Sequence, residues 1–166
     1  FTAGLALLRM LENRQKPEFG AIAINGATGG VGMLATGLFS KAGFEVHAIS
    51  GKPEHSDFLR HIGATKVLSR ESILTEKAMD SICFGGAVDS VGGAALSSLL
   101  AKVAPYGNVA SCGLVASHSL NTTVMPFIIR GVSLLGIASA GTERLIREKV
   151  WALLSKYWDS NTLNAL

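Results

Sequence analysis

A glycine-rich segment follows an apolar stretch near the start of the chain, in the sequence AIAINGATGGVG of residues 21–32. Glycine lets a backbone approach a pyrophosphate without a Cβ in the way, and the spacing gives this role to Gly29. The same spacing gives Gly32 the role of letting the next helix pack closely on the strand. N–H groups at the start of that helix, with the positive end of its dipole, would face the anion. The segment therefore predicts a phosphate-binding turn between a strand and a helix.

This turn does not identify its ligand by itself. The dinucleotide fingerprint G-x-G-x-x-G is incomplete because Ala27 occupies its first glycine position, so another phosphate ligand stays open. A tight turn that binds nothing also stays open. A P-loop is excluded, because no Gly-Lys-Ser or Gly-Lys-Thr follows the glycines.

A second polar turn follows about 20 residues later, where an NAD-binding unit places an acidic residue on the adenosine ribose. Ser50, Gly51 and Lys52 stand there instead. A hydroxyl and an ammonium group can bind a 2′-phosphate, so this turn favours NADP(H) over NAD(H). The missing acid also argues against a methyltransferase. An ordinary polar turn before Pro53 is the alternative.

Other reactive residue types show no pattern that assigns them to a site. The four histidines lack metal-ligand spacing, so no metal site is predicted. Cys83 and Cys112 stand alone, which favours free thiols in a reducing, cytoplasmic compartment. No Lys follows Tyr106 or Tyr157 at the fourth position, so the Tyr-x-x-x-Lys pair of short-chain dehydrogenases is missing. Asp89 ends a predicted strand, where bonds to neighbouring backbone are expected rather than contact with a ligand.

Apolar segments alternate with segments of helical periodicity, after a first helical pattern that includes Leu5, Leu8 and Leu11. Strands are predicted over 21–24, 44–49, 66–68, 87–91, 108–112 and 132–137, and helices over 31–42, 57–62, 72–79, 94–103 and 142–157, with a loop and helical turn over 122–129. Such alternation is typical of a parallel sheet covered on both faces. The predicted fold is α/β, a Rossmann-type doubly wound parallel sheet of about six strands with helices on both faces.

Composition limits the class of protein. The chain of 166 residues is 48% apolar, which suits one globular domain over residues 1–166 with a buried core. Its 15 basic and 12 acidic residues are scattered, so neither a nucleic acid nor a membrane surface is predicted as a partner. No apolar run reaches the length of a membrane span. Phe1 leads at once into a helical pattern, from which we expect a segment of a longer protein.

Six segments together resemble the cofactor domain of the medium-chain dehydrogenase/reductase superfamily: GATGGVG, AISGK, HIGATKVLSR, GAVDSVGG, ASCGL and TTVMPFIIRGVSLLGI. Within that superfamily they are most similar to the zinc-free quinone oxidoreductase branch, which includes acrylyl-coenzyme A reductase. The likeness covers nearly the whole chain, and the last segment is its most specific part.

The resemblance implies three groups of cofactor-binding residues, for the pyrophosphate, the 2′-phosphate end and the nicotinamide. They are, in that order, Thr28, Gly29, Gly30 and Val31; Ser50, Gly51, Lys52 and Arg70; and Leu114, Ile128 and Ser139. Arg70 would reach the second group from the end of the third strand. Lys52 departs from the family, which has arginine there, and so keeps the charge but loses the planar fork.

The resemblance also implies a function. Family members wrap a second, catalytic domain around the cofactor domain, so this chain would be the NADP(H)-binding half of a reductase of roughly twice its length. The full protein would transfer hydride to an electron-poor alkene such as a quinone or an enoyl thioester, whereas this chain, without catalytic residues, would be inactive alone. The alternative is a structural protein of the same family that binds NADPH without turnover. A homodimer through an edge strand between Val132 and Ile137 is also expected.

Overall fold

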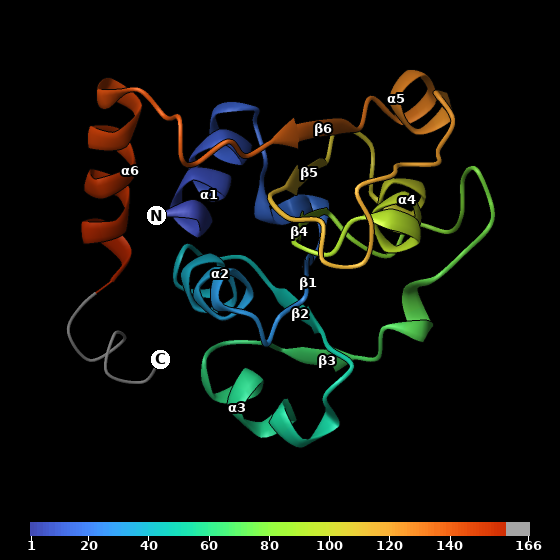
Figure 1. The fold of residues 1–166 in the computed structure, drawn as a ribbon, viewed down its shortest axis with the longest axis horizontal. Helices are drawn as coiled ribbons and strands as arrows, with labels where there is room; N and C mark the ends of the chain where they lie inside the picture. Colours follow the sequence, from blue (N-terminus) through green and yellow to red (C-terminus); the bar gives the residue numbers. More distant parts are fainter. Residues whose placement is uncertain (159–166) are drawn as a thin grey trace.

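Six parallel strands form one sheet in the computed structural model, which describes residues 1–158 (Figure 1). The strands are β1 (Ile22–Asn25), β2 (Val46–Ile49), β3 (Lys66–Leu68), β4 (Gly86–Asp89), β5 (Asn108–Ser111) and β6 (Ser133–Gly136). Their order across the sheet is β3-β2-β1-β4-β5-β6, and every neighbouring pair is parallel. The order reverses between β1 and β4, so their carboxyl ends form the switch point at which open α/β sheets bind ligands.

Helices cover both faces of this sheet. One face is covered by α1 (Thr2–Glu12), α2 (Gly30–Lys41) and α3 (Ser56–His61), and α6 (Arg144–Tyr157) packs on the outside of α1 and α2. The other face packs against α4 (Gly93–Lys102) and α5 (Met125–Arg130). Figure 1 shows α4 and α5 on the opposite side of the strands from α1, α2 and α6. Among the described residues, no helix is both long and apolar enough to cross a membrane.

The architecture confirms the predicted doubly wound sheet. All six predicted strands are present, with ends that differ by a few residues, and β6 lies at an edge of the sheet as predicted. The strands are buried on both faces, which explains their continuous apolar runs. In β1, for example, Ile22 and Ile24 contact the helices of the first face, and Ala23 contacts the second.

The predicted helix over 72–79 is wrong. The chain forms only a 3-10 turn at Glu71–Ile73 and then an irregular segment that continues to Phe84. The apolar residues of the segment do not share a buried face, because Ile73 is buried whereas Leu74 is 49% exposed. The N–H of Thr75 donates to Oγ of Ser98 on α4 at 3.0 Å, so a tertiary contact satisfies a group that would bond within a helix.

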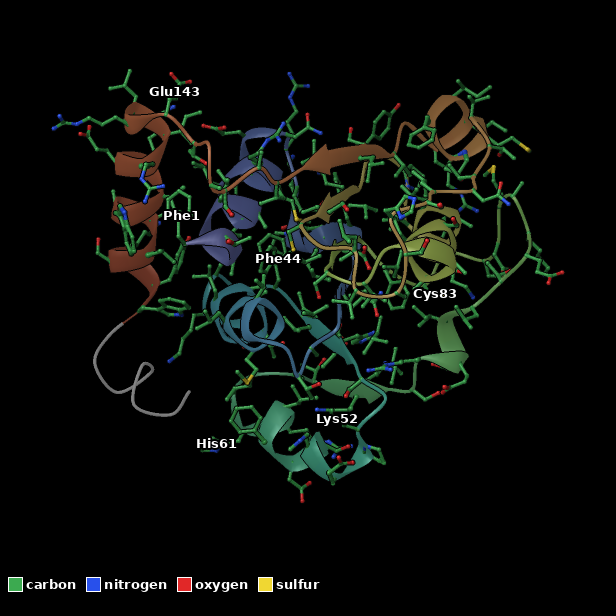
Figure 2. All side chains as sticks on the ribbon, in the orientation of Figure 1. Phe1, Phe44, Lys52, His61, Cys83 and Glu143 are labelled. Carbon is green, nitrogen blue, oxygen red and sulfur yellow. The ribbon has the colours of Figure 1, made fainter. Side chains whose placement is uncertain are left out.

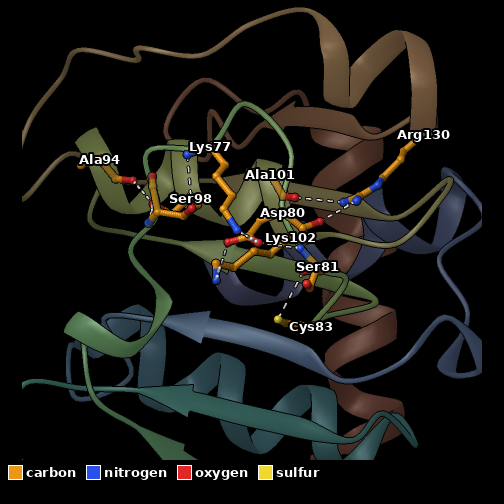
Figure 3. Close-up of polar contacts among 10 residues, drawn as sticks. Lys77, Asp80, Ser81, Cys83, Ala94, Ser98, Ala101, Lys102 and Arg130 are labelled. Atoms are coloured by element: carbon orange, nitrogen blue, oxygen red, sulfur yellow. Dashed lines mark hydrogen bonds and ion pairs between the residues drawn. The ribbon is translucent and has the colours of Figure 1, made fainter.

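A polar cluster around Asp80 holds this segment against α4 (Figure 3). The Asp80 carboxylate accepts hydrogen bonds from the N–H of Ser81 at 2.8 Å and from Nζ of Lys77 at 3.2 Å, and it pairs with Lys102 on α4 at 3.3 Å. These contacts, the Ser81 N–H first, hold the pKa of Asp80 well below its ordinary value. Arg130 of α5 donates to the carbonyl oxygen of Asp80, so the cluster also fixes the end of α5.

Candidate functional site

The glycine turn lies at the carboxyl end of β1 and leads into α2, as predicted. Thr28 is half-buried, Gly29 is the N-cap of α2 and Gly30 its first residue, and both glycines are exposed. The N–H groups of Gly30, Val31 and Gly32 have no hydrogen-bond acceptor within residues 1–158. A Cβ at Gly30 would meet no atom within 4 Å, so open space lies beside these donors. The start of α2 thus offers free donors and the positive end of a helix dipole to an anion.

Two further glycines allow this turn to pack. Gly26 has a φ of +78°, a conformation that favours glycine, and a Cβ there would overlap the hydroxyl of Ser90. A Cβ at Gly32 would overlap the carbonyl oxygen of Gly26 and would lie 2.7 Å from Cα of Ala27. Gly32 therefore permits the close contact of helix and strand that the sequence predicted for it.

The second turn, from Ser50 to Lys52, follows β2 at the same end of the sheet. Ser50 is buried, and its Oγ accepts a hydrogen bond from the N–H of Lys52 at 3.0 Å. Gly51 and Lys52 are exposed, and Figure 2 shows Lys52 beside the chain that leads from β2 to α3. Arg70 crosses this turn, because a Cβ at Gly51 would lie 2.6 Å from its Nε and 2.8 Å from its Cζ. The structure therefore brings both predicted cations to one turn.

The three residues expected at the nicotinamide do not all lie together. Leu114 follows β5 and Ser139 follows β6, so both come after the carboxyl ends of neighbouring strands. Ile128 lies on α5, which leads into the beginning of β6. At the end of this helix, the carbonyl oxygen of Arg130 accepts a hydrogen bond from the N–H of Tyr106, just before the beginning of β5. Within this chain Ile128 therefore lies toward the amino ends of the strands, away from the other two. Its side chain is 75% exposed.

Two buried polar residues lie beneath the site, at the switch point. Asp89 ends β4, Asn25 ends β1, and the two residues are opposite one another in register. Nδ2 of Asn25 donates to Oδ1 of Asp89 at 2.7 Å, and the N–H of Gly92 donates to Oδ2 at 2.9 Å. Burial raises the pKa of Asp89 above its ordinary value. Asp89 thus bonds neighbouring backbone as predicted, whereas sequence reasoning missed Asn25, although a polar residue at the end of an apolar strand is a usable signal.

The chain has two cysteines, and the surroundings of one of them shift its pKa. Burial, followed by the charge of Asp89, raises the pKa of the Cys112 thiol to about 11, so this residue stays protonated at neutral pH. Cys83 and Cys112 are both free. Within residues 1–158, no three His, Cys, Asp or Glu side chains gather as a metal site would require.

The arrangement fits a nicotinamide dinucleotide phosphate. The free N–H groups at the start of α2 suit a pyrophosphate, and the exposed pair Lys52 and Arg70 suits a further phosphate at the end of β2. Both groups of donors lie at the carboxyl edge of the sheet, on strands β1 and β2 that are direct neighbours. The donor chemistry and the open space beside Gly30 therefore agree with the predicted cofactor.

Known proteins resemble this chain in sequence. The zinc-binding dehydrogenase family matches residues 30–156. The putative quinone oxidoreductase YhfP of Bacillus subtilis is 44% identical over 157 residues, which cover 93% of this chain and 48% of YhfP. The acrylyl-CoA reductase AcuI of Ruegeria pomeroyi is 36% identical over 168 residues, which cover 100% of this chain and 51% of AcuI. The chain spans about half the length of these curated relatives, and their names confirm the resemblance to quinone oxidoreductases and acrylyl-coenzyme A reductase.

Solved structures resemble this chain in fold as well. The yhdH oxidoreductase from Salmonella enterica, in complex with NADP, has a TM-score of 0.95 and 35% identity over 99% of this chain and 51% of its own. The structure of YhfP from Bacillus subtilis, with NAD bound, has a TM-score of 0.95 and 41% identity over 99% of this chain and 50% of its own. The same sheet thus occurs in proteins crystallised with either cofactor.

Proposed function

Since this chain belongs to the zinc-binding dehydrogenase family, we propose that it is the NADP(H)-binding domain of a two-domain oxidoreductase. The whole enzyme would use NADPH to reduce an electron-poor alkene, such as a quinone or an enoyl thioester. The names of YhfP and AcuI support this class of reaction. That the chain covers about half of each relative supports a second domain in the whole protein.

The observation that carries this proposal is the pair of cations at the turn after β2. Arg70 lies across Gly51, Lys52 follows Gly51 directly, and the three residues from Ser50 to Lys52 include no acid. A turn that selects NAD(H) would place a carboxylate here for the ribose hydroxyls, and that carboxylate would repel a 2′-phosphate. The turn therefore favours NADP(H).

The contribution of this chain to the reaction is binding and orientation. NADPH supplies the hydride when it is bound. The N–H groups of Gly30 and Val31 hold the pyrophosphate, while Lys52 and Arg70 hold the 2′-phosphate. Leu114, in the loop after β5, would border the nicotinamide. Donors that stabilise charge on the substrate would come from the second domain.

Titration calorimetry with NADPH and NADH tests this function. We expect NADPH to bind at least about tenfold more tightly, because one charge-assisted hydrogen bond contributes about 1.5 to 3 kcal/mol before screening. Lys52→Ala should weaken NADPH binding and leave NADH binding unchanged, and added salt should narrow the gap. Lys16→Ala, an exposed lysine before β1 at the other end of the strands, is the matched control and should change neither. Equal affinity for both cofactors, or an equal loss for both in Lys52→Ala, would refute the assignment.

An enzyme is favoured over a protein that binds NADPH without turnover. Both curated relatives carry names of oxidoreductases, and neither name describes a structural protein. Turnover by the whole protein separates the two possibilities, since a purely structural protein would bind NADPH without oxidising it.

We also propose a homodimer through the free edge of β6. β6 is an edge strand of the sheet. The segment of chain from the end of β5 to α5, which leads into β6, exposes large apolar side chains. These are Leu114, Val115, Leu120, Val124, Met125, Ile128 and Ile129, with exposures from 39% to 87%. A second copy related by a two-fold axis would pair β6 with β6 and cover the exposed apolar side chains of α5, Ile128 and Ile129.

Two further properties belong to this proposal, namely independence of zinc and a cytoplasmic location. The first is supported by histidines without metal-ligand spacing, and the second by two free cysteines. Metal analysis of the purified whole protein and fractionation of the cells that make it test these two properties.

A further inference from the structure

The pair of Asn25 and Asp89 makes none of the proposed cofactor contacts, yet it lies beneath both loops that do. We propose that this pair is a positioning device, which holds the glycine turn and the loop after β5 in the geometry that binds NADP(H). The identity of the ligand rests on the proposed function, whereas the positioning of the loops does not. Asp89 has no exposed surface and Asn25 is 2% exposed, so the pair acts through other residues and not by touching the ligand.

The first connection runs from the pair to the glycine turn. The carbonyl oxygen of Asn25 accepts a hydrogen bond from Oγ of Ser90 at 2.9 Å. The Ser90 side chain in turn lies against Gly26, where a Cβ would overlap it. The carbonyl oxygen of Gly26 accepts a bond from the N–H of Gly29 at 2.9 Å. The position of Gly29, the N-cap of α2, therefore depends on the residues that the pair holds.

The second connection runs from the pair to the loop after β5. The Asp89 carboxylate accepts bonds from the N–H groups of Val91 at 3.3 Å and Gly92 at 2.9 Å, which turns the chain sharply after β4. The N–H of Ala116 donates to the carbonyl oxygen of Val91 at 2.8 Å. A Cβ at Gly92 would lie 3.3 Å from Cα of Leu114. The loop that carries Leu114 therefore rests on the turn that Asp89 fixes.

The chemistry of the pair explains why these two residue types are needed. A carboxylate has two acceptor oxygens, and here one takes the Asn25 amide and the Val91 N–H while the other takes the Gly92 N–H. Two apolar residues could join β1 to β4 equally well, but they would leave these backbone donors unpaired inside the protein. The pair thus couples the end of the sheet to the two loops.

Exchanging the two polar groups tests this inference. Asn25→Asp alone sets two carboxylates against one another, whereas Asn25→Asp combined with Asp89→Asn restores an amide-to-carboxylate bond and leaves an acceptor for Gly92. The amide nitrogen at position 89 cannot accept from the N–H of Val91, so this one bond stays lost in the double variant. We expect the single variant, without cofactor, to speed amide hydrogen exchange at Gly29 and Ala116, whose N–H groups are hydrogen-bonded in the two loops, and to raise the NADPH Kd about tenfold. The double variant should restore most of both quantities, because only the 3.3 Å bond from Val91 is lost. Ser90→Ala, which removes one hydroxyl, is the milder variant if Asn25→Asp does not fold.

Asp80→Asn is the matched control, because it changes a hydrogen-bonded carboxylate whose partners, Lys77, Ser81 and Lys102, lie outside both loops. It should lower the free energy of unfolding without changing exchange at Gly29 and Ala116. The inference is overturned if Asn25→Asp or Ser90→Ala lowers the free energy of unfolding while exchange at Gly29 and Ala116 stays as in the wild type, or if the exchanged pair keeps the exchange rates and NADPH Kd of Asn25→Asp. If the wild type binds neither NADPH nor NADH, the proposed function fails, and hydrogen exchange still decides whether the pair positions the loops.

Discussion

The glycine turn allows stability and cofactor binding to be separated by two alanine substitutions two residues apart. Gly32 is buried, and a Cβ there would overlap the carbonyl oxygen of Gly26 and lie 2.7 Å from Cα of Ala27. Both neighbours are backbone, so neither can rotate away. Gly30 is exposed, and a Cβ there would meet nothing within 4 Å. The two positions therefore differ in packing while sharing one helix.

The expected magnitudes follow from these contacts. Overpacking a rigid site costs about 1 to 3 kcal/mol, and Gly32→Ala belongs at the upper end because α2 must move as a unit. Alanine stabilises a helix by about 1 kcal/mol relative to glycine, which offsets part of this cost. The net loss in the free energy of unfolding is therefore about 2 kcal/mol. Gly30→Ala carries no packing penalty and should raise the free energy of unfolding by up to about 1 kcal/mol. Its methyl group would occupy the space proposed for the pyrophosphate and should weaken NADPH binding at least about tenfold.

Urea unfolding and titration calorimetry on the same three proteins measure both effects. The expected pattern is a loss of stability in Gly32→Ala and a loss of NADPH affinity without loss of stability in Gly30→Ala. Gly32→Ala with wild-type stability would show that the close packing of α2 on β1 is not needed. Gly30→Ala with wild-type NADPH affinity would show that the pyrophosphate does not approach the start of α2.

Three further outcomes are expected. The free energy of unfolding should fall as the pH rises from 9.0 to about 11, because the Cys112 thiol stays protonated in the folded protein and ionises in the unfolded one. Urea unfolding over that pH range measures this fall. Cys112→Ala should remove the pH dependence, and Cys83→Ala should keep it. This chain should not reduce quinones or enoyl thioesters at saturating NADPH, and turnover that copurifies with it would show that catalytic groups lie within it. Sedimentation at micromolar concentration should show a dimer, and Ile128→Glu should dissociate it; a monomeric wild type would contradict pairing through β6.

The sequence alone determined the sheet and the place of the glycine turn. Strands buried on both faces need continuous apolar runs, and helices between them need apolar residues at helical spacing, so both patterns can be recognised within short segments. Gly29, Gly30 and Gly32 could be placed for the same reason, since a strand, a turn and the start of a helix are consecutive in the chain. The predicted doubly wound sheet followed from these local patterns together with their alternation.

Tertiary structure decided what distant residues do to one another. In the segment from Ser72 to Met79, the backbone of Thr75 bonds Ser98 of α4, across 23 positions, in place of a partner within a helix. Arg70 reaches Gly51 because β2 and β3 are adjacent in the sheet. Ile128 lies toward the amino ends of the strands because α5 leads into β6.

The pair of Asn25 and Asp89 shows the same division. The sequence places each residue at the end of an apolar run, but the 2.7 Å bond between them joins positions 64 residues apart. Only the order of the sheet, with β4 beside β1, brings the amide to the carboxylate. Local patterns fix which groups stand at the ends of strands, and the pairing of strands fixes which of those groups meet, because that pairing depends on contacts between segments far apart in the chain.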